Sequence, residues 1–165
     1  GRGAIVVLTA GLGRARDYDT AEHWAATIAR YENRLLGDLD RLAGQRRIDR
    51  RRVIVAGSSL GGDLAWALAL RNPDRVCGAV VMASRASYRV SEAAAGRLRE
   101  RGLRFYFTMG TTDAEARRAG ALAAAGWLEG LGVASRFRAI EGLGHEIARP
   151  GEVADGLAFV AGGGR

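Results

Sequence analysis

The 165-residue sequence contains no lysine, one cysteine, two histidines and two prolines. The lone Cys77 excludes an internal disulfide, and in an apolar strand its thiol behaves as a small hydrophobic group. The two histidines, His23 and His145, are too far apart in the chain to suggest a metal-ligand set, so we expect no metal and no other cofactor. No apolar run is long enough to cross a bilayer, so we expect no membrane span.

Arginine supplies all of the positive charge of the basic side chains. All 25 basic residues are arginine, and the formal net charge is +7. A basic balance can indicate a nucleic-acid partner. However, the densest arginine cluster, at residues 46–52, has no aromatic residue within it on which a base would stack. We therefore interpret the cluster as solvated surface and expect no nucleic-acid partner. The absence of lysine indicates the coding bias of a GC-rich genome.

The chain also lacks a recognisable linker or signal peptide. With 48% hydrophobic residues it is large enough for one α/β domain with a core, which we place at residues 1–165. The missing signal peptide favours the cytoplasm. The sequence opens abruptly at Gly1, so a preceding segment stays an open alternative.

Apolar runs of strand length alternate with helical patterns along the whole chain. This order predicts an α/β fold with a predominantly parallel sheet of about five strands and helices on both faces. Arginines alternate with apolar residues in the last strand, which suggests an edge strand with one wet face. We expect strands at residues 4–8, 52–56, 76–82, 103–109 and 135–140, and helices at 20–43, 60–71, 91–101, 114–131 and 150–160.

Residues 53–62, VIVAGSSLGG, join an apolar strand to a helix through Gly-x-Ser-x-Gly. This arrangement is typical of a nucleophile elbow, with Ser59 as the nucleophile. Gly57 and Gly61 lack a Cβ, so strand and helix can approach closely. The helix that begins near Leu60 directs its amide end at the site, where developing negative charge is favoured. The alternative is a glycine-rich turn without a catalytic role. The apolar strand before the motif and the helix after it favour the elbow over this alternative.

A serine hydroxyl needs a base within hydrogen-bond reach, and the base needs an orienting carboxylate. His145 follows the last strand, at the edge where parallel sheets bind ligands, and we predict that it is the base. His23 lies on the long first helix and is read as a surface histidine. Asp113 follows the fourth strand and is the predicted acid, although a helix N-cap needs the same residue type.

Other motifs give weaker candidates. Glu141 and Glu146 flank the histidine and are the fallback acids, whereas Asp63 is expected to face out of its helix. The sequence GLG at residues 11–13 matches only part of a dinucleotide-binding loop, because the third glycine is missing.

The segments GSSLGG (57–62), GTTD (110–113) and GH (144–145) resemble the α/β-hydrolase superfamily, and look most like bacterial esterases of the polyhydroxybutyrate-depolymerase and feruloyl-esterase type. Segments 48–53 and 71–76 are also similar to those proteins, and the likeness runs from about residue 5 to 160. The resemblance implies a serine carboxylesterase without a cofactor, acting on a small or polymeric ester through Ser59, Asp113 and His145.

One departure from the family leaves alternatives open. The family's sheet has more strands before the elbow, and the loop after its third strand supplies an oxyanion amide. Here, either a preceding segment or a second copy of the chain completes the sheet, or residues 4–8 pair with the elbow strand. In the latter case Leu12, or its neighbour Gly11, joins Leu60 in the oxyanion hole.

Two questions about function also stay open. The alternative to an esterase is a truncated or non-catalytic hydrolase-fold domain with a binding or scaffolding role. In addition, one Ser-His-Asp triad serves ester, thioester and amide hydrolysis, so the acyl group and the alcohol are not assigned.

Overall fold

The computed structural model describes residues 5–7 and 17–162, which fall into two compact units divided between Arg46 and Arg47. The single domain over residues 1–165 stays a prediction. In the first unit, helix α1 (Ala21–Gln45) begins within one residue of the prediction, and its N-cap Thr20 accepts a side-chain hydrogen bond from the His23 amide at 3.1 Å. The helix runs two residues past its predicted end at residue 43, and the Arg46 amide caps it by donating to the Leu42 carbonyl at 2.8 Å.

The first predicted strand, at residues 4–8, is wrong for the residues that the structure describes. Ile5, Val6 and Val7 belong to no strand and are 55%, 78% and 45% exposed. An apolar run becomes a buried strand only where a neighbour supplies ladder hydrogen bonds, and these three residues have no ladder partner. The described sheet therefore has four strands rather than five.

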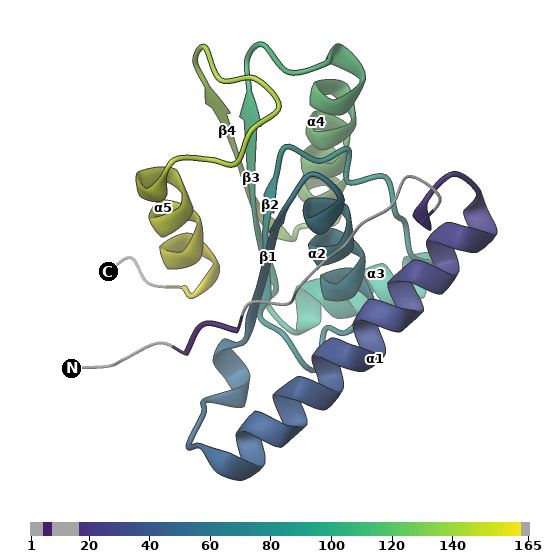
Figure 1. Cartoon of the computed structure of the whole chain (residues 1–165), viewed down its shortest axis with the longest axis vertical. Helices are drawn as coiled ribbons and strands as arrows, with labels where there is room; N and C mark the ends of the chain where they lie inside the picture. The colour runs from purple at the N-terminus through teal and green to yellow at the C-terminus, as the bar shows by residue number, and fades with distance from the viewer. Residues whose placement is uncertain (1–4, 8–16, 163–165) are drawn as a thin grey trace. The chain divides into compact units, whose positions relative to one another are not determined.

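The second unit contains a parallel sheet with the strand order β1-β2-β3-β4 (Figure 1). The strands are β1 (Ile54–Ser58), β2 (Gly78–Met82), β3 (Arg104–Gly110) and β4 (Ala134–Ile140). All three strand pairs are parallel, which confirms the predicted fold class. Within the described residues β1 and β4 are the edge strands, and the predicted edge position of the last strand is confirmed.

Helices cover both faces of this sheet (Figure 1). Helices α2 (Leu60–Arg71) and α4 (Glu115–Gly130) lie on one face and α5 (Pro150–Val160) on the other, while α3 (Glu92–Glu100) packs against α2. Because side chains alternate along a strand, β3 sends Phe105 and Phe107 toward Trp66 of α2, with ring centroids 5.2 and 5.7 Å away. On the opposite face, Tyr106 packs so closely against Gly156 of α5 that a Cβ there would lie 2.9 Å from the Tyr106 ring.

Element boundaries differ from the predictions by up to two residues. Helix α2 matches its predicted range, whereas β1 runs two residues further than expected, because Gly57 and Ser58 still pair with Val81 and Met82. The arginine-rich connection contains a short 3₁₀ helix, η2 (Arg50–Arg52). Cys77 lies just before β2, where burial raises the pKa of its thiol.

Candidate active site

Ser59 occupies the turn between the last residue of β1 and the first residue of α2. Its φ is 55° and its ψ is −122°, a conformation that costs energy for a residue with a Cβ. Two backbone hydrogen bonds hold the turn: the Ser59 amide donates to the Met82 carbonyl at 2.9 Å, and the Ser59 carbonyl accepts from the Asp63 amide at 3.0 Å. The predicted strand, turn and helix are thus present around this serine.

Close backbone packing around the turn depends on Gly57 and Gly62. A Cβ on Gly57 would lie 2.1 Å from the Gly61 carbonyl oxygen, and one on Gly62 would lie 2.7 Å from the Met82 carbonyl oxygen. Nothing lies within 4 Å of a Cβ placed on Gly61. The sequence interpretation was therefore right for Gly57 but wrong for Gly61, since the close approach on the helix side occurs at the next residue.

The loop that carries His145 follows β4 and is tied to the loop that follows β3. Thr112 donates to the Leu143 carbonyl through its amide at 3.0 Å and through its hydroxyl at 2.8 Å. The Gly142 amide donates to the Thr111 hydroxyl at 2.9 Å. Gly110 lets the two loops meet, because a Cβ there would lie 2.1 Å from the Leu143 carbonyl oxygen. These contacts fix the histidine loop against the aspartate loop.

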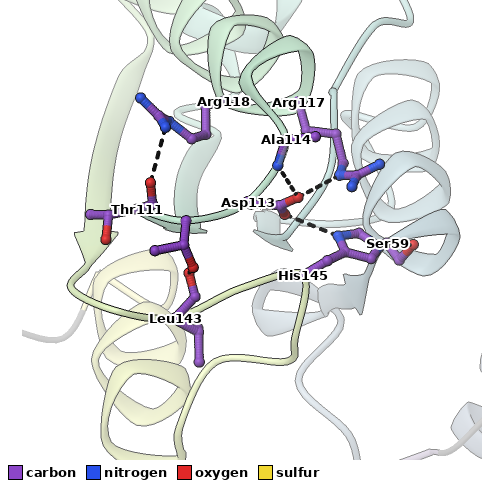
Figure 2. A network of polar contacts seen from close by, with 9 residues as sticks. Ser59, Thr111, Asp113, Ala114, Arg117, Arg118, Leu143 and His145 are labelled. Atoms are coloured by element: carbon purple, nitrogen blue, oxygen red, sulfur yellow. Dashed lines mark hydrogen bonds and ion pairs between the residues drawn. The ribbon is translucent and has the colours of Figure 1, made fainter.

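The three residues singled out in the sequence form one chain of hydrogen bonds at the carboxyl ends of the strands (Figure 2). The Ser59 Oγ lies 2.9 Å from His145 Nε2, and His145 Nδ1 lies 2.9 Å from Asp113 Oδ2. The Asp113 side chain is fully buried, whereas that of His145 is 37% exposed. In this geometry the imidazole can accept the serine proton on one side while the carboxylate stabilises it on the other.

The two carboxylate oxygens of Asp113 contact different partners, one at the start of α4 and the other on His145. Oδ2 faces His145, while Oδ1 accepts from the Ala114 amide at 2.6 Å and from Arg117 Nε at 2.8 Å. The N-cap of α4 is Ala114 rather than Asp113. Burial raises the pKa of the Asp113 carboxyl, but the hydrogen bonds from His145, Arg117 and Ala114 outweigh burial and hold that pKa below its usual range.

The remaining sequence candidates lie apart from this chain of contacts. His23 is exposed, as predicted, and its Nδ1 lies 2.5 Å from Asp19 Oδ1. Glu141 and Glu146 are exposed, and the carboxylate that pairs with His145 in the described residues is that of Asp113. Leu60 opens α2, so its amide has no carbonyl partner within the helix. Leu12 and Gly11 fall outside the described residues.

Asp63 does not face out of its helix as expected. Its Oδ1 accepts from the Ser84 hydroxyl at 2.8 Å and from the Ala86 amide at 3.0 Å, which anchors the loop after β2. Burial raises the pKa of the Asp63 carboxyl, and these hydrogen bonds offset the rise only in part. Ala83 and Ala86, in the same loop, have φ values of 46° and 48°, which no sequence pattern indicates.

No group of three or more metal-ligating side chains occurs among the residues that the structure describes. Within the same residues, no helix is both long and apolar enough to cross a membrane.

Neither a protein-family model nor a curated protein sequence matches the chain. Solved structures do match. Arabidopsis thaliana SOBER1 is 21% identical with a TM-score of 0.64, over 82% of this chain and 63% of that one. Esterase PE8 is 22% identical with a TM-score of 0.63, over 91% and 66% of the two chains. The Bacillus cereus carboxylesterase is 20% identical with a TM-score of 0.66, over 92% and 68%.

These neighbours are α/β-hydrolases, so the comparison shows that the chain has the α/β-hydrolase fold. At such identities the likeness describes the fold and not the activity. The chain spans 62–64% of the length of the SOBER1 structures that it matches.

Proposed function

We propose that the chain carries the catalytic site of a serine hydrolase that acts on carboxylic esters. The observation that carries the proposal is the hydrogen-bonded series from the Ser59 hydroxyl through His145 to the buried Asp113 carboxylate. The fold shared with solved esterases is consistent with it but does not identify the reaction.

In the proposed reaction, Ser59 Oγ attacks the acyl carbonyl carbon while His145 Nε2 takes the hydroxyl proton. The tetrahedral intermediate collapses, the bond to the alcohol oxygen breaks, and His145 returns the proton to that oxygen. Water then attacks the acyl-enzyme by the same route, releasing the carboxylic acid and restoring the serine. Throughout both steps Asp113 stays ionised and holds the imidazole in the required tautomer.

The developing oxyanion needs hydrogen-bond donors that point at it before the reaction begins. We assign the Leu60 amide to this role, because it opens α2 directly after Ser59 and has no partner within the helix. One such donor contributes about 3 kcal/mol to stabilisation of the transition state. The positive end of the α2 dipole acts in the same direction.

Labelling with a fluorophosphonate probe, read by mass spectrometry of the intact folded chain, tests the proposal. An activated serine attacks phosphorus and expels fluoride, so the wild type should gain one phosphonyl group per chain. Ser59→Ala should gain none. Ser58→Ala is the matched control, since it removes the neighbouring hydroxyl and should label like the wild type.

Two outcomes would overturn the proposal: an adduct that survives in Ser59→Ala, or a folded wild type that takes no label and does not hydrolyse p-nitrophenyl acetate. The second outcome would favour a hydrolase-fold domain with a binding or scaffolding role. The match covers only 63% of the SOBER1 chain, and we keep that alternative for this reason.

A further inference from the structure

We propose that Arg117 is a positioning residue for this chemistry, which holds the Asp113 carboxylate in the one orientation that serves His145. The inference rests on the proposed function and adds to it a residue outside the serine, histidine and aspartate. No motif in the sequence points to Arg117. It emerges only from the side-chain contacts at the start of α4 (Figure 2).

Arg117 and His145 each contact a different oxygen of the buried Asp113 carboxylate. Arg117 Nε donates to Asp113 Oδ1 at 2.8 Å, and His145 Nδ1 lies 2.9 Å from Oδ2. The aspartate side chain is fully buried and that of the arginine is 28% exposed. Since water does not reach the carboxylate, its rotation about the side-chain bond is limited by these partners and by the Ala114 amide.

Helix geometry explains why this arginine reaches the carboxylate. Arg117 follows Asp113 by four residues, and the first turn of α4, with the Arg117 amide donating to the Ala114 carbonyl at 2.9 Å, brings the two side chains to the same side. The guanidinium is a planar cation whose Nε–H points at Oδ1, the oxygen that does not face His145. It therefore compensates the buried negative charge without competing for the oxygen that His145 uses.

The titratable side chains that contact this carboxylate in the described residues are those of His145 and Arg117. Asp113 interacts with His145 and Arg117, and Arg117 also acts over a longer distance on Asp63, together with Arg85. The neighbouring Arg118 turns away, because its Nη1 donates to the Thr111 carbonyl at 2.9 Å. Arg117 and Arg118 thus form a matched pair on one helix, of which only the first contacts Asp113.

The first test compares the steady-state hydrolysis of p-nitrophenyl acetate by Arg117→Met and Arg118→Met. We expect Arg117→Met to lower kcat about tenfold with KM nearly unchanged, because the loss is in the alignment of the catalytic groups and not in substrate contacts. Arg118→Met should stay within about twofold of the wild type. Arg117→Lys, which keeps the charge but loses the planar guanidinium, should fall between the two.

A double-mutant cycle then asks whether Arg117 acts through Asp113. Asp113→Asn alone should lower kcat by about 10³–10⁴, because the amide favours the wrong tautomer of the imidazole. If Arg117 works through the carboxylate, adding Arg117→Met to Asp113→Asn should change kcat by less than about twofold. A further tenfold loss in that background would assign Arg117 an independent role and overturn the inference.

The pH dependence of stability gives a readout that needs no activity. The folded-state pKa of Asp113 is depressed, so its carboxylate adds stability that is present above the unfolded-state pKa of about 3.9 and is lost as the pH falls through the folded-state pKa. Arg117→Met removes one cause of the depression. Denaturant unfolding from pH 5 to pH 2 should therefore show a smaller loss of stability for Arg117→Met than for the wild type and Arg118→Met.

The outcomes separate the two proposals. An active wild type with equal kcat values for Arg117→Met and Arg118→Met overturns the role of Arg117 and leaves the proposed function standing. A folded wild type without labelling or turnover overturns both, even where the unfolding data show that the Arg117–Asp113 pair stabilises the fold.

Discussion

The edge of the sheet where the strands end and the interior under α2 are held together in different ways. At the edge, hydrogen bonds between loops and a turn with positive φ place side chains that are partly open to solvent, as the 37% exposure of His145 shows. Under α2, Phe105 and Phe107 of β3 pack in full burial against Trp66, and the half-buried Trp127 of α4 contacts the same ring. Changes at the edge should therefore alter chemistry more than stability, and changes in the interior should do the reverse.

The largest expected effect is on the edge side of this comparison. His145→Ala should lower kcat for p-nitrophenyl acetate by about 10⁵–10⁶ if the imidazole is the base. The side chain is 37% exposed and leaves no buried cavity, but its loss removes a hydrogen bond from the buried Asp113 carboxylate, so the unfolding free energy should fall by only about 1–2 kcal/mol. Equal turnover by the variant and the wild type would remove the histidine from the mechanism, and a large loss of stability would break the comparison.

Two glycines beside the Ser59 turn set a limit to this comparison, because Gly57 is packed against backbone as tightly as the interior is, whereas Gly61 is open. Gly57→Ala places a Cβ 2.1 Å from a backbone oxygen, so we expect a loss of about 3 kcal/mol or more in stability. Gly61→Ala meets nothing within 4 Å and gains helix propensity, so it should be neutral or stabilising by up to about 1 kcal/mol. Thermal and denaturant unfolding of both variants measures the difference, and equal losses would contradict the packing described here.

The smallest expected effect is at Asp63, which lies between the two regions. Asp63→Asn keeps an oxygen that can accept from the Ser84 hydroxyl and the Ala86 amide, and it removes a buried charge, so stability at pH 7 should be unchanged or higher. Asp63→Ala leaves both donors without this acceptor and should cost about 1–3 kcal/mol. The comparison is between unfolding free energies at pH 7, and a stable Ala variant with a weakened Asn variant would refute it.

Asp63 also gives a pH dependence of opposite sign to that of Asp113. Its folded-state pKa is raised, so the stability that it contributes is present below the unfolded-state pKa and is lost as the pH rises through the folded-state pKa. Asp63→Asn should remove this loss. Unfolding free energies of the wild type and Asp63→Asn, measured between pH 3 and pH 7, should therefore diverge as the pH rises.

Much of the fold followed from local patterns. Helix α2 spans its predicted range, and Thr20 and Ser91 cap their helices through side-chain hydrogen bonds as such residues are expected to do. Parallel pairing followed from the alternation of strands and helices. The strand at residues 4–8 failed because pairing is not local: an apolar run does not specify which neighbour, if any, will complete its hydrogen bonds.

The three residues of the candidate site could be chosen from the sequence, but the residues that hold them in position could not. Ser59, Asp113 and His145 could be chosen because each follows a strand end in a parallel sheet, where such ends meet at one edge. Their catalytic roles stay predictions. The contact of Arg117 with the second carboxylate oxygen, and of Asp63 with the loop after β2, depends on side-chain directions across elements that no spacing rule reports.

The positive φ of Ser59 sets stability and chemistry against each other at a single residue. A side chain in that conformation costs about 1–3 kcal/mol, and glycine would relieve most of the cost. A library selected only for heat resistance should therefore enrich Ser59→Gly and discard the hydroxyl. If serine is retained under selection for both heat resistance and ester turnover, the reaction requires the backbone to keep this strained conformation.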